Sequence, residues 1–353
     1  MRKSVKLKDI VEYAKGSQIN GDNLIEEAEF DYLNGGINPS GKWNETNCDA
    51  NTITISEGGN SCGYVNYMRK PFWCGAHCYY IYNVVGNTQY LYYALKSQQD
   101  RIMKLRSGAC MPNIKKGDLG DFEFNFDDDV KGQEKVTNIL SKLESVIEER
   151  KQELLCLDKL TKARFVEMFG DPYVNPLKWE KLKIKDAVTI EPQNGLYKPQ
   201  SDYVTDGSGI PILRIDGFYD GMVTDFASLK RLKCSETERQ RYLLLEDDIV
   251  INRVNSIEYL GKCAHIKDLL EDTVYESNMM RMHFDPEYYN PVYICKLLCS
   301  QFIYDQIVNH AKKSVNQASI NQKDVLDFNI YQPPLDLQNE FANFVHQVDK
   351  SKF

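Results

Sequence analysis

Residues 112–124 read PNIKKGDLGDFEF, and residues 318–330 read ASINQKDVLDFNI. At an offset of 206 positions the two stretches match at their isoleucine, aspartate and phenylalanine positions. The matched pairs are Ile114 with Ile320, Asp118 with Asp324, Asp121 with Asp327, and Phe122 with Phe328. This period is far longer than the repeat of a solenoid, so the chain is predicted to hold two similar domains.

The stretch that follows each copy also matches, QEKVTNIL at 133–140 against QNEFANFV at 338–345 after a one-residue shift. Residues 130–169 contain almost no helix breakers, and apolar residues recur there at alternating three- and four-residue steps, with Arg150 in one slot. This spacing is typical of a coiled-coil helix. The helix should span about 60 Å at ~1.5 Å per residue, and Gly-Asp-Pro at 170–172 should end it. Its predicted contact stripe consists of Val136, Leu140, Leu143, Ile147, Leu154 and Leu157.

The segments on either side of this helix are predicted to be mixed α/β. NTITIS at 51–56 and CYYIYNVV at 78–85 are strand-like, and GIPILRID at 209–216 and DIVINRV at 248–254 follow the same pattern in the second half. Residues 89–105 and 290–311 are each predicted to form a helix.

The predicted fold class is therefore α+β, with two similar mixed α/β domains joined by long coiled-coil-type helices. The predicted parts are residues 1–125 for the first domain, 126–172 for the central helix, 173–336 for the second domain, and 337–353 for the start of a second helix.

Bulk composition limits the function classes. A chain of 353 residues exceeds the usual size of one core. The net charge is −8 and no segment is uniformly basic, so a DNA-binding surface would have to be local. We find no membrane-spanning apolar run and no signal segment, so a cytoplasmic location without membrane contact is expected. The ten cysteines are scattered, which favours reduced thiols.

Several strings, taken in their order and spacing, resemble the DNA-specificity subunit of Type I restriction–modification systems. They are YLNGGINPSG at 32–41, NTITISEGGNSCGYVNY at 51–67, PFWCGAHCYYI at 71–81, the whole of 133–172, and SINQKDVLDFNIYQPPLDLQNEFANFV at 319–345. The resemblance covers essentially the entire chain.

This resemblance implies two target-recognition domains, each of which reads one half of a split double-stranded DNA site. It also implies that two helical regions pack as an antiparallel spacer and dock two adenine-methyltransferase subunits, which ATP-dependent motor–nuclease subunits join. The family's second helix normally continues beyond the position of Phe353, so the second spacer helix is expected to be truncated here.

Candidate DNA-binding residues lie in loops that mix basic, amide and aromatic side chains. Arginine pairs well with guanine, asparagine and glutamine pair well with adenine, and lysine suits phosphate. A solvated surface role remains open for each single residue. The candidates are Arg69, Lys70, Lys104, Arg106, Tyr197, Lys198, Arg253, Asn255, Lys312, Lys313, Asn316 and Gln317.

Three motifs suggest other chemistry, and each has a simpler structural explanation. GINPSGK at 36–42 fits a phosphate loop but is followed by Trp43 instead of Ser or Thr. GDPYVNP at 170–176 only partly fits an adenine-methyltransferase motif and is explained as a helix end. Cys74, His77 and Cys78 lack the distant second pair of ligands that a zinc site usually has. We therefore expect no cofactor, no metal and no catalytic residue.

The sequence thus predicts a non-catalytic DNA-binding subunit that reads a bipartite site and positions methyltransferase and motor–nuclease subunits. One alternative is the specificity subunit of a methylation-only or fused restriction system. Another is a scaffold whose duplicated domains bind protein and no DNA.

Overall fold

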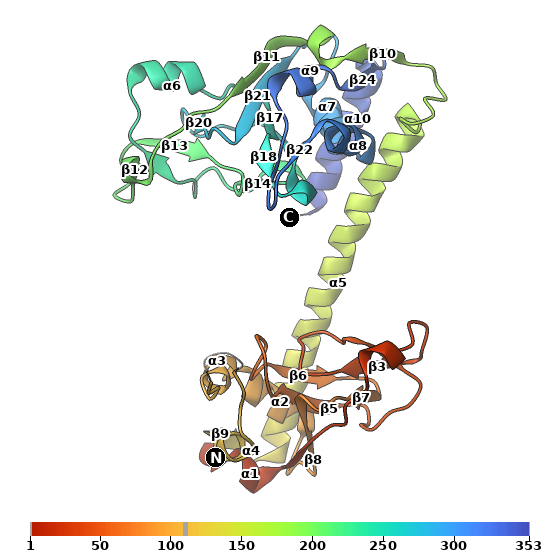
Figure 1. The fold of residues 1–353 in the computed structure, drawn as a ribbon, viewed down its shortest axis with the longest axis vertical. Helices are drawn as coiled ribbons and strands as arrows, with labels where there is room; N and C mark the ends of the chain where they lie inside the picture. Colours follow the sequence, from red (N-terminus) through yellow and green to blue (C-terminus); the bar gives the residue numbers. More distant parts are fainter. Residues whose placement is uncertain (1, 109–111, 353) are drawn as a thin grey trace. The chain divides into compact units, whose positions relative to one another are not determined.

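Two separately packed units, residues 1–151 and 152–353, make up the chain in the computed structural model, which describes residues 2–108 and 112–352. One helix, α5 (Val130–Phe169, 40 residues), runs through the boundary between them (Figure 1). The helix predicted over 130–169 is confirmed. Gly170 ends it at a φ of 79°, and its N–H bonds to the Val166 carbonyl at 2.8 Å, which is a glycine-capped helix end.

The first unit contains two small sheets and a separate strand pair. The sheets have the orders β2-β8-β5-β6 and β4-β3-β7, and β1 pairs with β9. The strands are β1 (Arg2–Lys6), β2 (Glu12–Lys15), β3 (Phe30–Leu33), β4 (Gly41–Trp43), β5 (Thr52–Ser56), β6 (Val65–Met68), β7 (Phe72–Cys74), β8 (Cys78–Tyr82) and β9 (Glu123–Asp127). The helices before α5 are α1 (Leu7–Ile10), α2 (Thr88–Lys96), α3 (Gln99–Met103) and α4 (Lys116–Gly120), and Gly21–Asn23 forms the 3₁₀ turn η1.

The core of the first unit lies between its four-stranded sheet and α2. Ile53 and Ile55 of β5 and Leu91 and Leu95 of α2 are fully buried in one cluster. Strand β9 alternates strictly, because its phenylalanines are buried and the residues between them are exposed. The strand-like sequence patterns therefore became strands whose apolar residues form this core.

The second unit is built around a six-stranded sheet with the order β11-β21-β17-β19-β15-β14. Its strands are β11 (Val188–Asn194), β14 (Phe218–Tyr219), β15 (Gly221–Val223), β17 (Ile249–Asn252), β19 (Cys263–His265) and β21 (Met279–Phe284). Three smaller groups have the orders β12-β16-β13-β20, β18-β23-β22 and β10-β24. Their strands are β10 (Glu180–Lys183), β12 (Tyr203–Val204), β13 (Ile210–Leu213), β16 (Arg231–Leu232), β18 (Val254–Asn255), β20 (Val274–Tyr275), β22 (Lys312–Lys313), β23 (Ala318–Ser319) and β24 (Asn329–Gln332).

Helices complete the second unit, and most of them contribute buried residues to its main core. They are α6 (Glu236–Tyr242), α7 (Pro291–Leu298), α8 (Gln301–His310), α9 (Gln322–Leu326) and α10 (Leu335–Ser351), and the 3₁₀ turns are η2 (Ile184–Asp186), η3 (Gln200–Asp202) and η4 (Ile257–Tyr259). The ring of Phe165 in α5 stacks on Tyr293 of α7 with centroids 5.6 Å apart, and Phe341 of α10 meets Phe165 edge-on at 5.5 Å. These contacts fasten the last turns of α5 and the final helix to the second domain.

The predicted duplication is confirmed at the level of elements. Helices α4 and α9 begin at Lys116 and Gln322, and the strands β9 and β24 begin at Glu123 and Asn329, so both pairs keep the offset of 206. Each of these strands pairs antiparallel with the first strand of its own half, β1 or β10. The fold therefore comprises two similar mixed α/β domains and long helices, as the sequence predicted.

The helical character predicted for 89–105 and 290–311 is confirmed, but a break divides each stretch into two helices. The first divides into α2 and α3 around Ser97 and Gln98, and the second divides into α7 and α8 around Cys299 and Ser300. Ser300 has extended backbone angles as the residue before α8. The Ser97 hydroxyl donates to the Ala94 carbonyl at 2.8 Å, which fits the preference of serine for helix boundaries, where its hydroxyl competes for nearby backbone groups.

Candidate nucleic-acid interface

The second unit collects two distant predicted loops on one small sheet. β18 pairs with β23, which pairs with β22, and the Ile320 N–H donates to the Arg253 carbonyl at 3.0 Å. Segment 253–255 therefore lies directly beside the hairpin of residues 312–319. The predicted residues that this arrangement brings together are Arg253, Asn255, Lys312, Lys313, Asn316 and Gln317.

The tip of this hairpin is an exposed polar and cationic loop with one apolar side chain. The Ser314 N–H closes the turn on the Gln317 carbonyl at 2.7 Å. Lys312 and Lys313 are exposed and form no ion pair with any residue in 2–108 or 112–352. Val315 is 96% exposed. Unpaired lysines suit phosphate, and an exposed amide or valine suits a base edge or a thymine methyl group.

Arg253 and Asn255 are partly engaged within the domain. One Arg253 guanidinium nitrogen, Nη1, donates to the Ser277 carbonyl at 3.2 Å, and Asn255 Oδ1 accepts from the Ser256 N–H at 2.8 Å. Arginine has five N–H donors and an asparagine amide has two. Each side chain is therefore held in place and keeps hydrogen-bonding capacity for a ligand.

Tyr197 and Lys198, adjacent in sequence, have different environments. Tyr197 follows β11 and is 76% exposed. The Lys198 ammonium lies 2.9 Å from Glu238 Oε1 and 3.6 Å from Asp202 Oδ2. The hydrogen bond to Glu238 raises the pKa of Lys198. The charge of Lys198 is thus balanced inside the domain, whereas the Tyr197 ring faces solvent.

The predicted residues of the first unit fall into two separate groups. Arg69 Nη2 pairs with Glu144 Oε2 of α5 at 2.8 Å, and Lys70 follows it in the same exposed turn. Lys104 and Arg106 are exposed and lead into the segment where Ser107 and Asn113 exchange backbone hydrogen bonds at 2.9 and 3.0 Å. An ion pair therefore joins the Arg69 turn to the long helix.

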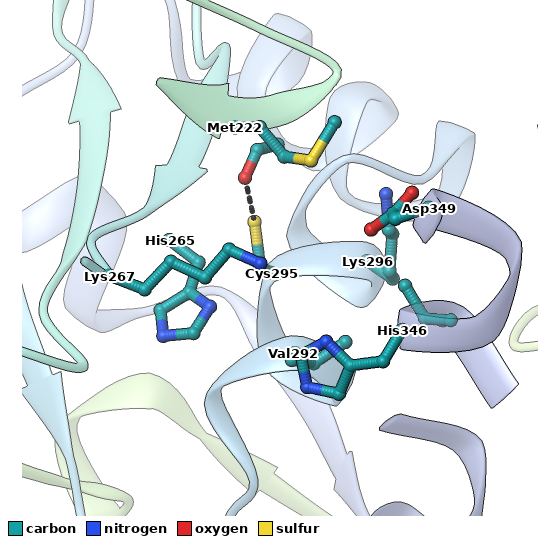
Figure 2. Close-up of a pocket in the computed structure, with 10 residues that line it drawn as sticks. Met222, His265, Lys267, Val292, Cys295, Lys296, His346 and Asp349 are labelled. Atoms are coloured by element: carbon teal, nitrogen blue, oxygen red, sulfur yellow. Dashed lines mark hydrogen bonds between the residues drawn. The ribbon is translucent and has the colours of Figure 1, made fainter. Parts of the chain in front are cut away.

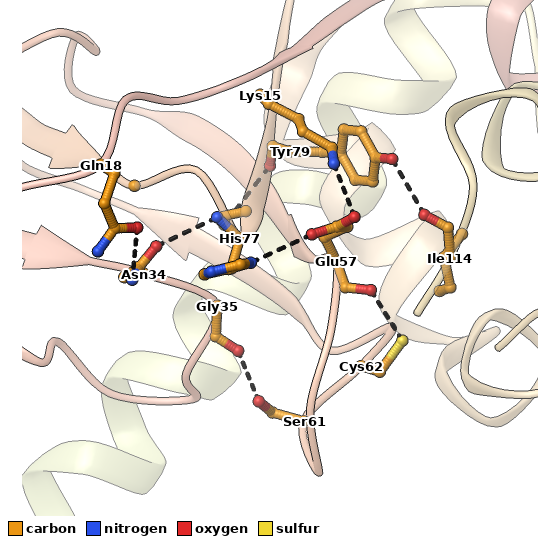
Figure 3. Close-up of polar contacts among 12 residues, drawn as sticks. Lys15, Gln18, Asn34, Gly35, Glu57, Ser61, Cys62, His77, Tyr79 and Ile114 are labelled. Atoms are coloured by element: carbon orange, nitrogen blue, oxygen red, sulfur yellow. Dashed lines mark hydrogen bonds and ion pairs between the residues drawn. The ribbon is translucent and has the colours of Figure 1, made fainter. Parts of the chain in front are cut away.

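A polar cluster that the sequence did not reveal lies at the strand ends of the first unit (Figure 3). Lys15 Nζ pairs with Glu57 Oε1 at 2.6 Å, and His77 Nδ1 lies 3.4 Å from Glu57 Oε2. Asn34 Nδ2 donates to Gln18 Oε1 at 3.2 Å, while Asn34 Oδ1 accepts from the His77 N–H at 3.1 Å. These residues come from four separate segments, so no local pattern marks them. Their only sequence signal is a polar residue directly beside a buried strand.

The cysteines beside His77 belong to the core. Cys74 and Cys78 are buried, whereas the His77 side chain is exposed and faces Glu57. Among the residues that the structure describes, no group of three or more His, Cys, Asp and Glu side chains is arranged to hold a metal ion. His77 is therefore placed with the polar cluster and apart from the two thiols.

The predicted stripe on α5 is largely uncovered along its middle. Val136, Leu143 and Ile147 are exposed. The other three members, Leu140, Leu154 and Leu157, are half-buried.

Helix α10 lies against the last turns of α5 and runs antiparallel to them. Glu340 near its start pairs with Arg164 at 3.0 Å, and Lys352 after its end pairs with Asp158 at 2.8 Å. An antiparallel helix pair, which the family resemblance implied, is thus present at residues 158–169. The apolar side chains at 136–147 are available for another partner.

The cavity drawn in Figure 2 is too small for a substrate. It lies among β15, β19, α7 and α10, and its lining includes His265, Cys295 and His346. Its internal volume is about 20 Å³, which is room for about one water-sized sphere. Cys295 Sγ donates to the Gly221 carbonyl at 3.5 Å across one wall.

The two remaining motifs have structural roles where the structure places them. GINPSGK spans the connection between β3 and β4, which pair as an antiparallel hairpin, so it does not join a buried strand to a helix. GDPYVNP forms the turn after α5, in which the Asn175 N–H bonds to the Asp171 carbonyl at 2.8 Å. None of the helices in the described parts of the chain has the length and apolar character needed to cross a membrane.

Comparison with known proteins identifies relatives of both units. The family profile described as "Type I restriction modification DNA specificity domain" matches residues 2–155 and 176–353. S.MgeORF438P of Mycoplasma genitalium, a type I specificity subunit by its name, is 35% identical over 153 residues, which are 42% of this chain and 38% of that protein. The specificity subunit of the Type I restriction enzyme EcoKI from Escherichia coli K12 is 30% identical over 172 residues, which are 48% of this chain and 36% of that protein. The matched regions thus span under two fifths of these curated relatives.

One solved structure shares the fold over the full length. The crystal structure of the S subunit of a Type-I restriction–modification system from M. genitalium aligns with a TM-score of 0.68 at 20% identity, covering 100% of this chain and 90% of that one.

Proposed function

This chain belongs to the Type I restriction modification DNA specificity domain family, and from that membership we propose that it selects the DNA site of a Type I restriction–modification complex. In this proposal each domain reads one half of a bipartite double-stranded site. The observation that carries the proposal is the double family match, one match on each domain.

The local distribution of charge supports DNA as the ligand despite the net charge of −8. In the second domain several basic residues are matched by acids, such as Arg231 with Glu271 at 2.7 Å and Lys198 with Glu238 at 2.9 Å. The lysines of the 312–319 hairpin are unmatched within the described residues. A small unpaired cationic loop beside amide side chains can hold phosphates and present base-reading groups on a chain that is acidic as a whole.

The partners are proposed to be two adenine-methyltransferase subunits and, in the full system, ATP-dependent motor–nuclease subunits. The exposed apolar residues of α5 support this docking role, because a coiled-coil stripe left in water favours a helical partner. In this proposal the chain itself has no catalytic residue and needs no cofactor. Methyl transfer and cleavage belong to the partners.

The test is selection of DNA by the assembled complex. The chain would be purified with its methyltransferase subunits and offered a randomised duplex library at two salt concentrations. We expect enrichment of one bipartite sequence, and no methyl transfer by the chain alone in the presence of labelled methyl donor. Absence of any enriched sequence would support a protein-binding scaffold instead.

An exchange of residues 1–125 for the matching domain of a relative tests whether the two domains recognise their half-sites independently. We expect only one half of the enriched site to change, because each domain carries its own core and its own loops. A change in both halves would contradict independent reading.

A further inference from the structure

The two domains have the same pattern of backbone hydrogen bonds at the ends of their strands, which we call the strand-end frame. In the first domain the Gly16 N–H bonds to the Cys78 carbonyl at 3.2 Å, and in the second the Gly195 N–H bonds to the Met279 carbonyl at 3.1 Å. The next N–H in the first domain, from Ser17, bonds to the Cys74 carbonyl at 2.9 Å, and its equivalent in the second domain, from Leu196, bonds to the Tyr275 carbonyl at 2.8 Å. Each of these acceptors lies four residues before the preceding acceptor in the chain.

Two further pairs of hydrogen bonds extend this match. Glu57 N–H bonds to the His77 carbonyl at 2.8 Å, as Arg253 N–H bonds to the Asn278 carbonyl at 2.9 Å. The carbonyl of Glu57 then accepts from Ile114 at 2.9 Å, as that of Arg253 accepts from Ile320 at 3.0 Å.

The glycines at the start of this frame explain why it is kept. A Cβ on Gly16 would lie 1.9 Å from the Cys74 carbonyl oxygen, and a Cβ on Gly195 would lie 2.4 Å from that of Tyr275. Only a residue without a side chain allows this approach of two backbones. The frame therefore assigns equivalent positions without ambiguity: residue 18 with 197, and residue 77 with 278.

The side chains at these equivalent positions differ in chemistry and reach solvent. The first domain presents Gln18 and His77, both exposed, and the second presents Tyr197, exposed, and Asn278, half-buried. Two domains that recognise different half-sites require a common backbone arrangement with different exposed side chains. The backbone arrangement sets the approach to DNA, and the side chains select the bases.

The first-domain pair is held in position by its neighbours. Gln18 donates from Nε2 to the Ile19 carbonyl at 3.0 Å and accepts at Oε1 from Asn34 at 3.2 Å. An amide has two donor hydrogens and two acceptor sites, so one of each remains without a partner among the described residues. That remaining pair is the bidentate set that matches adenine. His77 Nδ1 faces Glu57, which leaves Nε2 for a base edge.

The second-domain pair is less engaged. Among the described residues neither the Tyr197 hydroxyl nor the Asn278 amide has a hydrogen-bond partner. The Asn278 carbonyl accepts from the Arg253 N–H at 2.9 Å, and the Arg253 carbonyl accepts from the Ile320 N–H directly after the 312–319 hairpin. Arg253 Nη1 also donates to the Ser277 carbonyl. Asn278 therefore lies one hydrogen-bonded segment away from the residue that follows the hairpin, and Tyr197 follows Leu196, whose carbonyl accepts from the Ser277 N–H at 3.0 Å.

We propose that Gln18 with His77, and Tyr197 with Asn278, are equivalent specificity-determining pairs, one for each half-site. This inference rests on the proposed DNA recognition and adds which residues select the bases. Gln18 selects adenine in the first half-site. The four residues act on the identity of bases, whereas Lys312 and Lys313 act on affinity.

The test transplants one pair onto the other domain. A Gln18→Tyr, His77→Asn double variant would be assembled with its methyltransferase partners and selected against a library randomised in both half-sites. We expect at least a tenfold loss of affinity for the original site and a new base preference in the first half-site only. The reciprocal Tyr197→Gln, Asn278→His variant should alter only the second half-site.

Two further variants keep the outcome decisive. Gln18→Glu keeps the shape of the side chain but removes both N–H donors, including the one to the Ile19 carbonyl. It should disfavour adenine in favour of cytosine, because a carboxylate accepts from the cytosine amino group. Asn125→Tyr, at an exposed position of β9 outside the cluster, should leave both half-sites unchanged. Unaltered base preferences with wild-type affinity in the Gln18 variants would overturn the proposal. If the wild-type complex enriches no site, DNA recognition itself fails and not this assignment.

Discussion

At the scale of single residues, the pairing of each cation decides whether it is available to a ligand. The sequence predicts Lys198, Arg69 and Lys312 equally as DNA-binding residues, yet Lys198 and Arg69 each have a carboxylate within 3 Å. Lys312 and Lys313 have no such partner within the described residues. A phosphate that approaches them displaces no internal ion pair, which makes them better phosphate-binding candidates than Lys198 or Arg69.

Replacement of Lys312 and Lys313 by alanine should weaken binding to all DNA sequences by a similar factor. Each lost phosphate contact lowers the slope of log affinity against log salt by about 0.9. The check is the affinity of the assembled complex for a cognate and a random duplex at several salt concentrations. Lys181→Ala, an exposed residue of β10, is the matched control. A loss confined to the cognate duplex would mean that these lysines read bases.

His265 gives the second domain a pH-dependent stability. Its side chain is largely buried, and burial lowers its pKa from the ordinary value of 6.5, although Asp247 at 2.8 Å acts in the opposite direction. As pH falls below about 6.5, the unfolded chain binds a proton that the folded chain does not. Stability is therefore fully present above pH 6.5 and is lost as pH falls toward the folded pKa.

We expect His265→Gln to reduce the fall in melting temperature between pH 7.5 and pH 5.5. Thermal unfolding of the second domain within the full chain, followed by circular dichroism, measures this difference. His346→Gln serves as the control, because that side chain is exposed. Equal pH dependence in the wild type and in His265→Gln would show that other groups control the acid response.

At the scale of elements, α5 shows the difference between helix formation and helix burial. Its 40 residues form one helix because, after Gly132 in the first turn, no breaker interrupts them before Gly170. Its last turns are covered by α7 and α10, but Leu143 and Ile147 are 53% and 55% exposed. Covering a large apolar side chain contributes roughly 1.5–3 kcal/mol, so a partner helix on this stretch would be held firmly.

Leu143→Glu combined with Ile147→Glu should therefore weaken assembly with the methyltransferase subunits at least tenfold and leave the chain folded. Size-exclusion chromatography with light scattering on the mixed subunits reports the assembly. Lys142→Glu adds the same acidic side chain one position away and should have a much smaller effect. Undiminished assembly of the double variant would place the docking surface elsewhere.

At the scale of the whole molecule, the duplication gives one chain two similar domains of different surface chemistry. The family match covers both copies, and the hydrogen bonds of the strand-end frame recur in both. One helix connects the two units in sequence. We therefore expect the number of residues in α5 to control the number of base pairs between the two half-sites.

Four helix-forming residues inserted near Glu149 should lengthen the preferred spacer by roughly two base pairs. Four residues add about 6 Å at ~1.5 Å each, and B-DNA rises ~3.4 Å per base pair. Four residues also nearly preserve the apolar stripe, since one turn takes 3.6. The insertion point precedes the stretch that α10 covers. Selection from a duplex library with variable spacing measures the result, and an unmoved optimum would assign α5 to docking alone.

The sequence by itself determined the duplication, the long helix and the mixed α/β class of both domains. These features are periodic or local: the 206-residue offset, the stripe from Val136 to Leu157 and the Gly170 stop are all readable along the chain. The sequence did not reveal the breaks at Ser97 and Ser300. The free-energy difference between helix and loop at these residues is smaller than the free energy that tertiary packing contributes.

Only the tertiary structure decided which polar residues meet. Gln18, Asn34 and His77 come together because strand order brings the ends of β2, β3 and β8 to one place, and strand order cannot be read from local pattern. The same holds for the ion pairs that neutralise Lys198, whereas Lys312 has no such partner in the part of the chain that the structure describes. Helices and turns depend on neighbours in sequence, whereas a binding surface depends on neighbours in space.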